Sequence, residues 1–216
     1  MRPPATDRRS PLQNRVTPFG ELAAVPSRGL FTGNRGGRFH TDARTLTGRR
    51  WASRQWICCL LEFKGRQREV WGRSYTELFF LDEPTALAAG HRPCFECRRA
   101  DAMTFAEKWR DAGGLRARPH ADEMDDVLHR ERLQGREKRL CRSNIDTVPD
   151  GAFVALEEGA FAVRVDTLLR WTPDGYQERR RRPRGVAVDV LTPPAILAVL
   201  SAGYHPHWHP SADDAP

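Results

Sequence analysis

Two cysteines separated by two residues, Cys94 and Cys97, are the side chains in this sequence best placed to do chemistry. The Cys-x-x-Cys step is the common chelating unit of structural zinc sites, because one tight turn lets both sulfurs reach the same tetrahedral ion. A thioredoxin-like redox pair and two ordinary reduced thiols are the alternatives. Flanking charges from Arg92, Arg98 and Arg99 favour the thiolate form, which indicates metal binding or reactivity.

A short helix is expected immediately before this turn. Asp82 is a typical N-cap, Pro84 is tolerated in a first helical turn, and Gly90 is a typical residue just past a helix end. A thioredoxin-like pair would instead follow a buried parallel strand. The helix and its glycine stop therefore favour a zinc turn over a redox pair.

The stretch ALAAGHRPCFECRR (residues 86–99) resembles the second half of the Ada-type zinc-binding domain of bacterial alkyl-DNA repair proteins. The shared pattern is an alanine-rich helix, a glycine, Arg-Pro-Cys, two residues and a second cysteine, and the similarity extends over about residues 75–99. The whole chain is also similar to uncharacterised bacterial proteins, which implies no activity. The local resemblance implies a bound Zn²⁺ and DNA as the partner.

The sequence departs from that family upstream of the turn. The family supplies its other two ligands from a Cys-x-x-x-Cys pair, whose first thiolate accepts a methyl group from a DNA phosphotriester. Here the upstream cysteines are the adjacent Cys58 and Cys59, which point to opposite faces if residues 56–63 form a strand. We expect Cys59 as the third ligand, with Cys58 as the alternative and His91 or His40 to complete the site. Methyl transfer is not predicted.

The charge distribution favours a polyanionic partner. The net charge is +7, and residues 1–56 hold eleven basic residues against three acidic ones. Arginines make up 32 of the 35 basic residues, a bias that a GC-rich genome alone can produce. The expected nucleic-acid contacts are Arg92, Arg98 and Arg99 beside the metal, together with Arg35 and Arg38 of a glycine-rich segment that is either an anion-binding loop or an ordinary turn.

Two further groups could bind metal or act in acid–base chemistry. Asp122, Asp126 and His129 share one face of a helix expected over residues 119–133, although a solvated polar face is the favoured explanation. Three histidines alternate in the C-terminal segment YHPHWHP, where such tracts bind transition metals or are incidental. Signatures of familiar hydrolases are absent from the sequence.

The predicted fold class is α+β. We expect a small, mostly antiparallel sheet with short helices and the cysteine hairpin, followed by a C-terminal β-meander with a terminal helix. The predicted organisation is a flexible basic arm (1–29), a zinc-hairpin α+β module (30–145), a β-rich module (146–205) and a flexible tail (206–216).

The sequence therefore predicts a zinc-containing protein that binds nucleic acid, with DNA expected and the zinc structural. Its alternatives are a metal- or thiol-dependent enzyme acting on DNA, or a structural or partner-binding protein. The apolar runs are too short to cross a bilayer, and no secretory signal is recognised, so the expected location is the cytoplasm.

Overall fold

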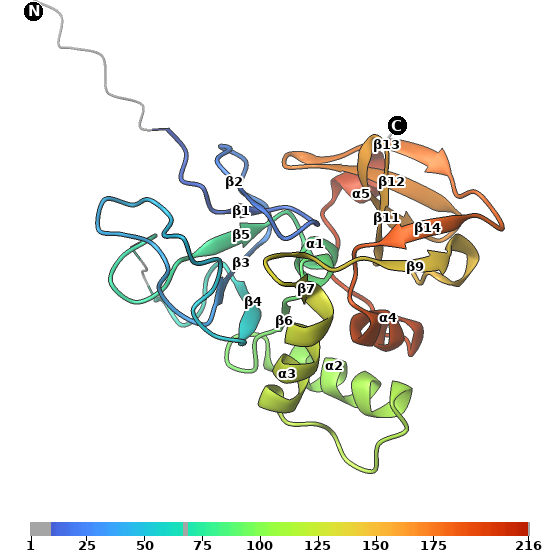
Figure 1. Cartoon of the computed structure of the whole chain (residues 1–216), viewed down its shortest axis with the longest axis horizontal. Coiled ribbons are helices and arrows are strands. Elements are labelled where there is room, and N and C mark those ends of the chain that lie inside the picture. Colours follow the sequence, from blue (N-terminus) through green and yellow to red (C-terminus); the bar gives the residue numbers. More distant parts are fainter. Residues whose placement is uncertain (1–9, 67–68, 216) are drawn as a thin grey trace, which may run out of the picture.

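The protein has the predicted α+β architecture, with two six-stranded sheets and five α-helices within residues 10–66 and 69–215, the part that this computed structural model describes. Figure 1 shows the first sheet in blue to green, the second in yellow to orange, and α1 (Glu83–Ala88) between them. Helices α2 (Arg99–Ala112), α3 (Ala121–Arg132) and α4 (Pro194–Ser201) gather at one end. No helix of the described part is long and apolar enough to span a membrane.

The first sheet carries the cysteines. Its strand order is β2-β1-β5-β3-β4-β6, in which β1–β5 and β4–β6 run parallel and the other neighbours antiparallel. The strands are β1 (Arg15–Val16), β2 (Leu22–Ala23), β3 (Phe31–Arg35), β4 (Trp56–Leu60), β5 (Leu78–Phe80) and β6 (Arg92–Pro93). The β4–β6 pairing places the chain that follows α1 beside the strand containing Cys58 and Cys59.

The second sheet is the predicted meander. Its order is β13-β12-β11-β10-β14-β9, and every neighbouring pair is antiparallel. The strands are β9 (Cys141–Asn144), β10 (Phe153–Leu156), β11 (Gly159–Arg164), β12 (Thr167–Thr172), β13 (Gly175–Arg181) and β14 (Ala187–Val190). Two short strands, β7 (Leu133–Gln134) and β8 (Glu137–Lys138), form a separate hairpin after α3.

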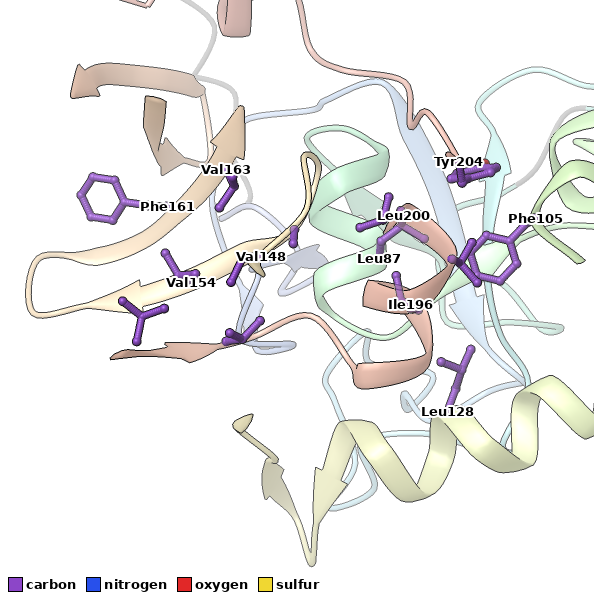
Figure 2. Close-up of a cluster of buried hydrophobic side chains, with 14 of the residues drawn as sticks. Leu87, Phe105, Leu128, Val148, Val154, Phe161, Val163, Ile196, Leu200 and Tyr204 are labelled. Carbon is purple, nitrogen blue, oxygen red and sulfur yellow. The ribbon is translucent and has the colours of Figure 1, made fainter. Parts of the chain in front are cut away.

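One apolar core joins the helices to the second sheet. Leu87 of α1, Phe105 of α2 and Leu128 of α3 pack in the same cluster as Val154 and Phe161 of the meander, and all five are buried (Figure 2). Residues on both sides of the predicted boundary near residue 145 therefore contribute to a single core. Burying this apolar surface is the main term that holds the helices on the sheet.

Both predicted flexible ends require correction where they are described. Residues 10–29 of the predicted arm include β1 and β2, and Val16 is buried within the first sheet, so this part of the arm is folded. Residues 1–9 of the predicted arm lie outside the described residues. The predicted tail forms α5 (Ser211–Asp214), which buries Ala212 against the second sheet. Both segments are polar in composition, and composition does not show the contacts that they make with residues far away in the sequence.

Asp82 is both the N-cap of α1 and the anchor of the second sheet. Its Oδ1 accepts from the Thr85 backbone at 3.0 Å and the Thr85 hydroxyl at 2.6 Å. Its Oδ2 accepts from the Tyr176 hydroxyl at 2.8 Å and the His209 backbone at 3.2 Å. One fully buried carboxylate thus satisfies donors from the helix, the meander and the C-terminal segment.

We predict that Asp82→Ala lowers the free energy of unfolding by about 3 kcal/mol or more, because it removes the cap and leaves buried donors without an acceptor. Urea denaturation followed by circular dichroism measures the change. The control is Asp126→Ala, which removes an exposed ion pair with Arg54 and should leave the free energy of unfolding nearly unchanged. Equal losses in the two variants would contradict the anchoring role.

Candidate metal centre

The β4–β6 pairing places three cysteines around one point. The Cys94 backbone N–H donates to the Cys58 carbonyl at 3.0 Å, which extends the parallel pairing by one residue. Cys59 then faces the turn that holds Cys94 and Cys97, and the three sulfurs lie within 4.8 Å of one another. Cys59 and Cys94 are buried, whereas Cys97 is partly exposed. These are the three cysteines that the sequence predicts as ligands, and they lie close enough to hold a metal ion.

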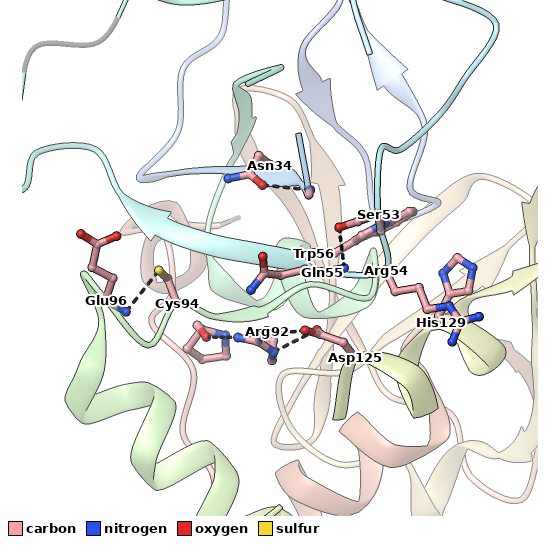
Figure 3. A network of polar contacts seen from close by, with 12 residues as sticks. Asn34, Ser53, Arg54, Gln55, Trp56, Arg92, Cys94, Glu96, Asp125 and His129 are labelled. Carbon is pink, nitrogen blue, oxygen red and sulfur yellow. Dashed lines mark hydrogen bonds and ion pairs between the residues drawn. The ribbon is translucent and has the colours of Figure 1, made fainter. Parts of the chain in front are cut away.

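The backbone of the turn supports negative charge on the sulfurs. The Glu96 N–H points at Cys94 Sγ at 3.4 Å (Figure 3), and the Leu60 N–H points at Cys97 Sγ at 3.4 Å. Hydrogen bonds from backbone amides stabilise a thiolate and orient it toward an ion. The turn therefore supplies outer-shell contacts as well as ligands.

The three thiols also shift one another's pKa values. Hydrogen bonds from Cys59 and Cys97 lower the pKa of Cys94, whereas the hydrogen bond to Cys94 raises the pKa of Cys59. One sulfur therefore gains thiolate character at the expense of another. A divalent ion would displace the thiol protons and allow all three sulfurs to be thiolates.

A cavity of about 500 Å³ opens beside the cysteines. All three line it, together with polar side chains that include Asn34, Gln55, Arg66, Tyr75 and Glu96. Glu96 is held by Arg66 at 2.7 Å. Among the residues described, no further His, Cys, Asp or Glu joins the three-sulfur group. An ion held by the three sulfurs would therefore border this cavity.

The candidate fourth ligands from the sequence are placed elsewhere, which corrects the prediction. His91 is buried between the rings of Trp56 and Phe80, and its Nε2 accepts from Arg35 Nε at 3.4 Å. His40 hydrogen-bonds the Thr76 hydroxyl at 2.8 Å and the Gly72 carbonyl at 3.0 Å. Neither histidine belongs to the sulfur group.

Cys58 is also not a ligand, because strand alternation turns it to the other face of β4. There its fully buried sulfur lies 3.5 Å from Arg98 Nη1, and burial raises the pKa of its thiol. The adjacent cysteines thus have different surroundings, one in the core and one at the cavity.

Three of the arginines predicted to contact nucleic acid, Arg35, Arg92 and Arg98, are buried and hold contacts within the protein. Arg92 makes a bidentate pair with Asp125 at 3.0 and 2.7 Å (Figure 3). Arg98 pairs with Glu83 at 2.8 Å and Asp101 at 2.9 Å, and Arg35 donates to backbone carbonyls. Of the remaining two, Arg99 is exposed, and Arg38 is partly exposed and paired with Asp42.

The two histidine-containing candidates also do not assemble into metal sites. Asp126 pairs with Arg54 at 2.8 Å, while the His129 ring meets the edge of Trp51. His207 lies 3.4 Å from Asp101, and His209 hydrogen-bonds Ser211. In the described part of the chain these groups make separate polar contacts.

Sequence reasoning missed a cluster of basic residues around Trp56. Arg35 and Arg132 both stack on its ring, and Lys138 lies nearby. The segment Arg49-Arg50-Trp51 borders the same region. The juxtaposition of two arginines and a tryptophan was visible in the sequence, but its link to Arg132 and Lys138 depends on the tertiary fold.

No family model matches this chain, and no match was found among curated proteins or solved structures.

We predict that the purified protein binds one divalent metal ion, and that Cys59→Ser, Cys94→Ser and Cys97→Ser each weaken binding at least about tenfold. Metal content by mass spectrometry and competition with a chromogenic chelator measure this. Cys58→Ser tests the neighbouring sulfur on the opposite face, and Cys141→Ser tests a cysteine outside the cluster. Both should retain the metal once circular dichroism shows that they fold. The assignment would be contradicted if Cys58→Ser or Cys141→Ser lost the metal while the three ligand variants kept it.

Proposed function

We propose that this protein binds Zn²⁺ through Cys59, Cys94 and Cys97 and uses the stabilised fold to bind nucleic acid, with DNA as the expected form. The observation that carries the proposal is the three-sulfur cluster, because thiolates in a tetrahedral arrangement are the ligands that zinc prefers. An ion there would connect β4 to the turn before α2. Its role in the proposal is to hold these elements together.

Exposed arginines without acidic partners support the nucleic-acid part of the proposal. Arg49, Arg50, Arg99 and Arg136 are exposed, and none forms an ion pair within residues 10–66 and 69–215. Arg50 and Arg136 also donate to the backbone carbonyls of Arg136 and Gly48, which are neutral partners. The positive charges of all four therefore remain available to phosphates and can release condensed counterions. They replace the buried arginines as the expected contacts.

A second function is favoured by one specific observation. The sulfur cluster borders the cavity of about 500 Å³, and three protein ligands with an open position are the arrangement of catalytic zinc sites. The second candidate is therefore a metal-dependent enzyme acting on nucleic acid. Incubating labelled DNA with metal-loaded protein tests it, since turnover by the wild type and none by Cys94→Ser would favour the enzyme over a binding protein.

We predict that affinity for a DNA oligonucleotide falls steeply with salt, with a log–log slope of roughly −3 to −4 if the four exposed arginines each contact a phosphate. Fluorescence anisotropy between about 50 and 200 mM salt measures the slope. Replacing Arg49, Arg50, Arg99 and Arg136 by Gln should weaken binding and flatten the slope by roughly one unit for each phosphate that the protein no longer neutralises.

The matched control replaces exposed arginines that already have acidic partners. Arg110 pairs with Asp111 at 2.6 Å and Arg118 with Glu107 at 3.4 Å. Arg110→Gln and Arg118→Gln should leave affinity nearly unchanged. A salt-independent titration of the wild type, or no binding at all, would reject the nucleic-acid proposal while leaving the metal prediction intact.

A further inference from the structure

Three cations lie around Trp56 without a carboxylate partner. The guanidinium carbons of Arg35 and Arg132 each lie 3.9 Å from the Trp56 ring centroid, and each arginine is 1% exposed. Lys138 is half-buried, with its ammonium group directed at the Ala88 carbonyl. None of the three forms an ion pair within the described ranges.

The partners of these cations are neutral. Arg35 donates to the Gly20 carbonyl at 2.8 Å, and Arg132 donates to the carbonyls of Gly90 at 2.9 Å and Arg54 at 2.6 Å. The Nε of Arg132 is buried and has no hydrogen-bond partner. Buried charges are normally paired, so this arrangement lacks a counter-charge and leaves a donor unused.

The lowered pKa values of Lys138 and Arg132 are those expected for buried cations without a counter-anion. Burial, together with the charges of Arg35 and Arg132, lowers the pKa of Lys138 to about 7. Burial also lowers the pKa of Arg132 to about 9, against an opposing effect of Asp125. That carboxylate is already held by both arms of Arg92. The cluster therefore retains an uncompensated positive potential.

A small void adjoins this cluster. It has a volume of about 10 Å³, room for about one oxygen atom, and its lining contains no acidic residue. The lining residues include Arg35, Arg132, Lys138 and Trp56, together with Arg50 and Trp51.

A groove of about 400 Å³ adjoins the void, since Arg50 and Trp51 line both. The groove is completed by Gly48, Arg49, Ala52 and Arg136, again without an acidic residue. The half-buried Trp51 ring is braced by Trp56 and His129, at centroid distances of 6.1 and 5.6 Å. A supported aromatic ring among exposed arginines is a typical stacking platform for a nucleic-acid base.

We propose that this groove binds the phosphorylated end of a nucleic-acid strand, with one oxygen of the terminal phosphate directed into the void and the end nucleoside stacked on Trp51. A terminal phosphate carries a charge near −2 and three free oxygens, whereas an internal phosphodiester carries one charge and two free oxygens. The doubly charged phosphate matches a cluster that lacks a counter-charge. In this arrangement Arg50, which lines both the void and the groove, contacts the remaining phosphate oxygens. The inference rests on the proposed nucleic-acid function for the identity of the strand.

The test compares single-stranded DNA oligonucleotides of one sequence, with either a phosphate or a hydroxyl at the 5′ end and, in a second pair, at the 3′ end. Anisotropy at constant ionic strength should show at least about tenfold tighter binding for a phosphorylated end. Arg50→Gln and Trp51→Ala should abolish that preference. Arg184→Gln, an exposed arginine on the second sheet's side of the molecule, should preserve it.

Equal affinity for phosphate and hydroxyl ends would overturn this inference and leave the proposed function standing. If no oligonucleotide binds, the proposed function fails, and inorganic phosphate then tests the site alone. Phosphate should raise the melting temperature of the wild type above that in chloride of equal ionic strength, and Arg50→Gln should remove the rise. An equal rise in both proteins, or no rise in the wild type, would overturn the site.

Discussion

The buried ion pair between Glu83 and Arg98 is the contact on which the arrangement of the molecule depends. Glu83 lies in the first turn of α1, and Arg98 directly follows the cysteine turn, so the pair fixes that turn against the helix. Glu83 also accepts from the Tyr204 hydroxyl at 2.7 Å and the His207 backbone at 3.0 Å. The same carboxylate therefore connects the cysteine turn to the C-terminal segment. A buried pair is weak evidence for stability on its own, but removing one partner would leave a charge without compensation.

Much of the local structure was predictable because its signals are short-range. Asp82, Pro84 and Gly90 mark the ends of α1 by capping chemistry that needs no tertiary information. The two-residue spacing of Cys94 and Cys97 fixes a chelating turn in the same way. The place of Cys59 beside this turn was also predictable, because alternation along a strand allows only one of two adjacent cysteines to face the turn.

The roles of the arginines were not predictable, because they depend on partners far along the chain. Arg92 is neutralised by Asp125, which is 33 residues away, and the tail is ordered by Asp82 and Glu83, more than 120 residues before it. In sequence, a buried arginine and a phosphate-binding arginine look alike. The sequence therefore could not show that Arg92 and Arg98, two of the five predicted contacts, are neutralised by carboxylates inside the fold.

The alternation of β3 and β4 explains why two candidate sites occur side by side without sharing residues. Gln55, Ile57 and Cys59 line the cavity beside the sulfur cluster, whereas Trp56 faces the void with the cations. On β3, Asn34 lines the cavity and Arg35 the void, and the register pairs Arg35 with Trp56. A metal ion that holds β4 against β6 on one face would also fix Trp56 on the other. With that ion bound, the two candidate sites would be linked through one strand, with their ligands on opposite sides of the sheet.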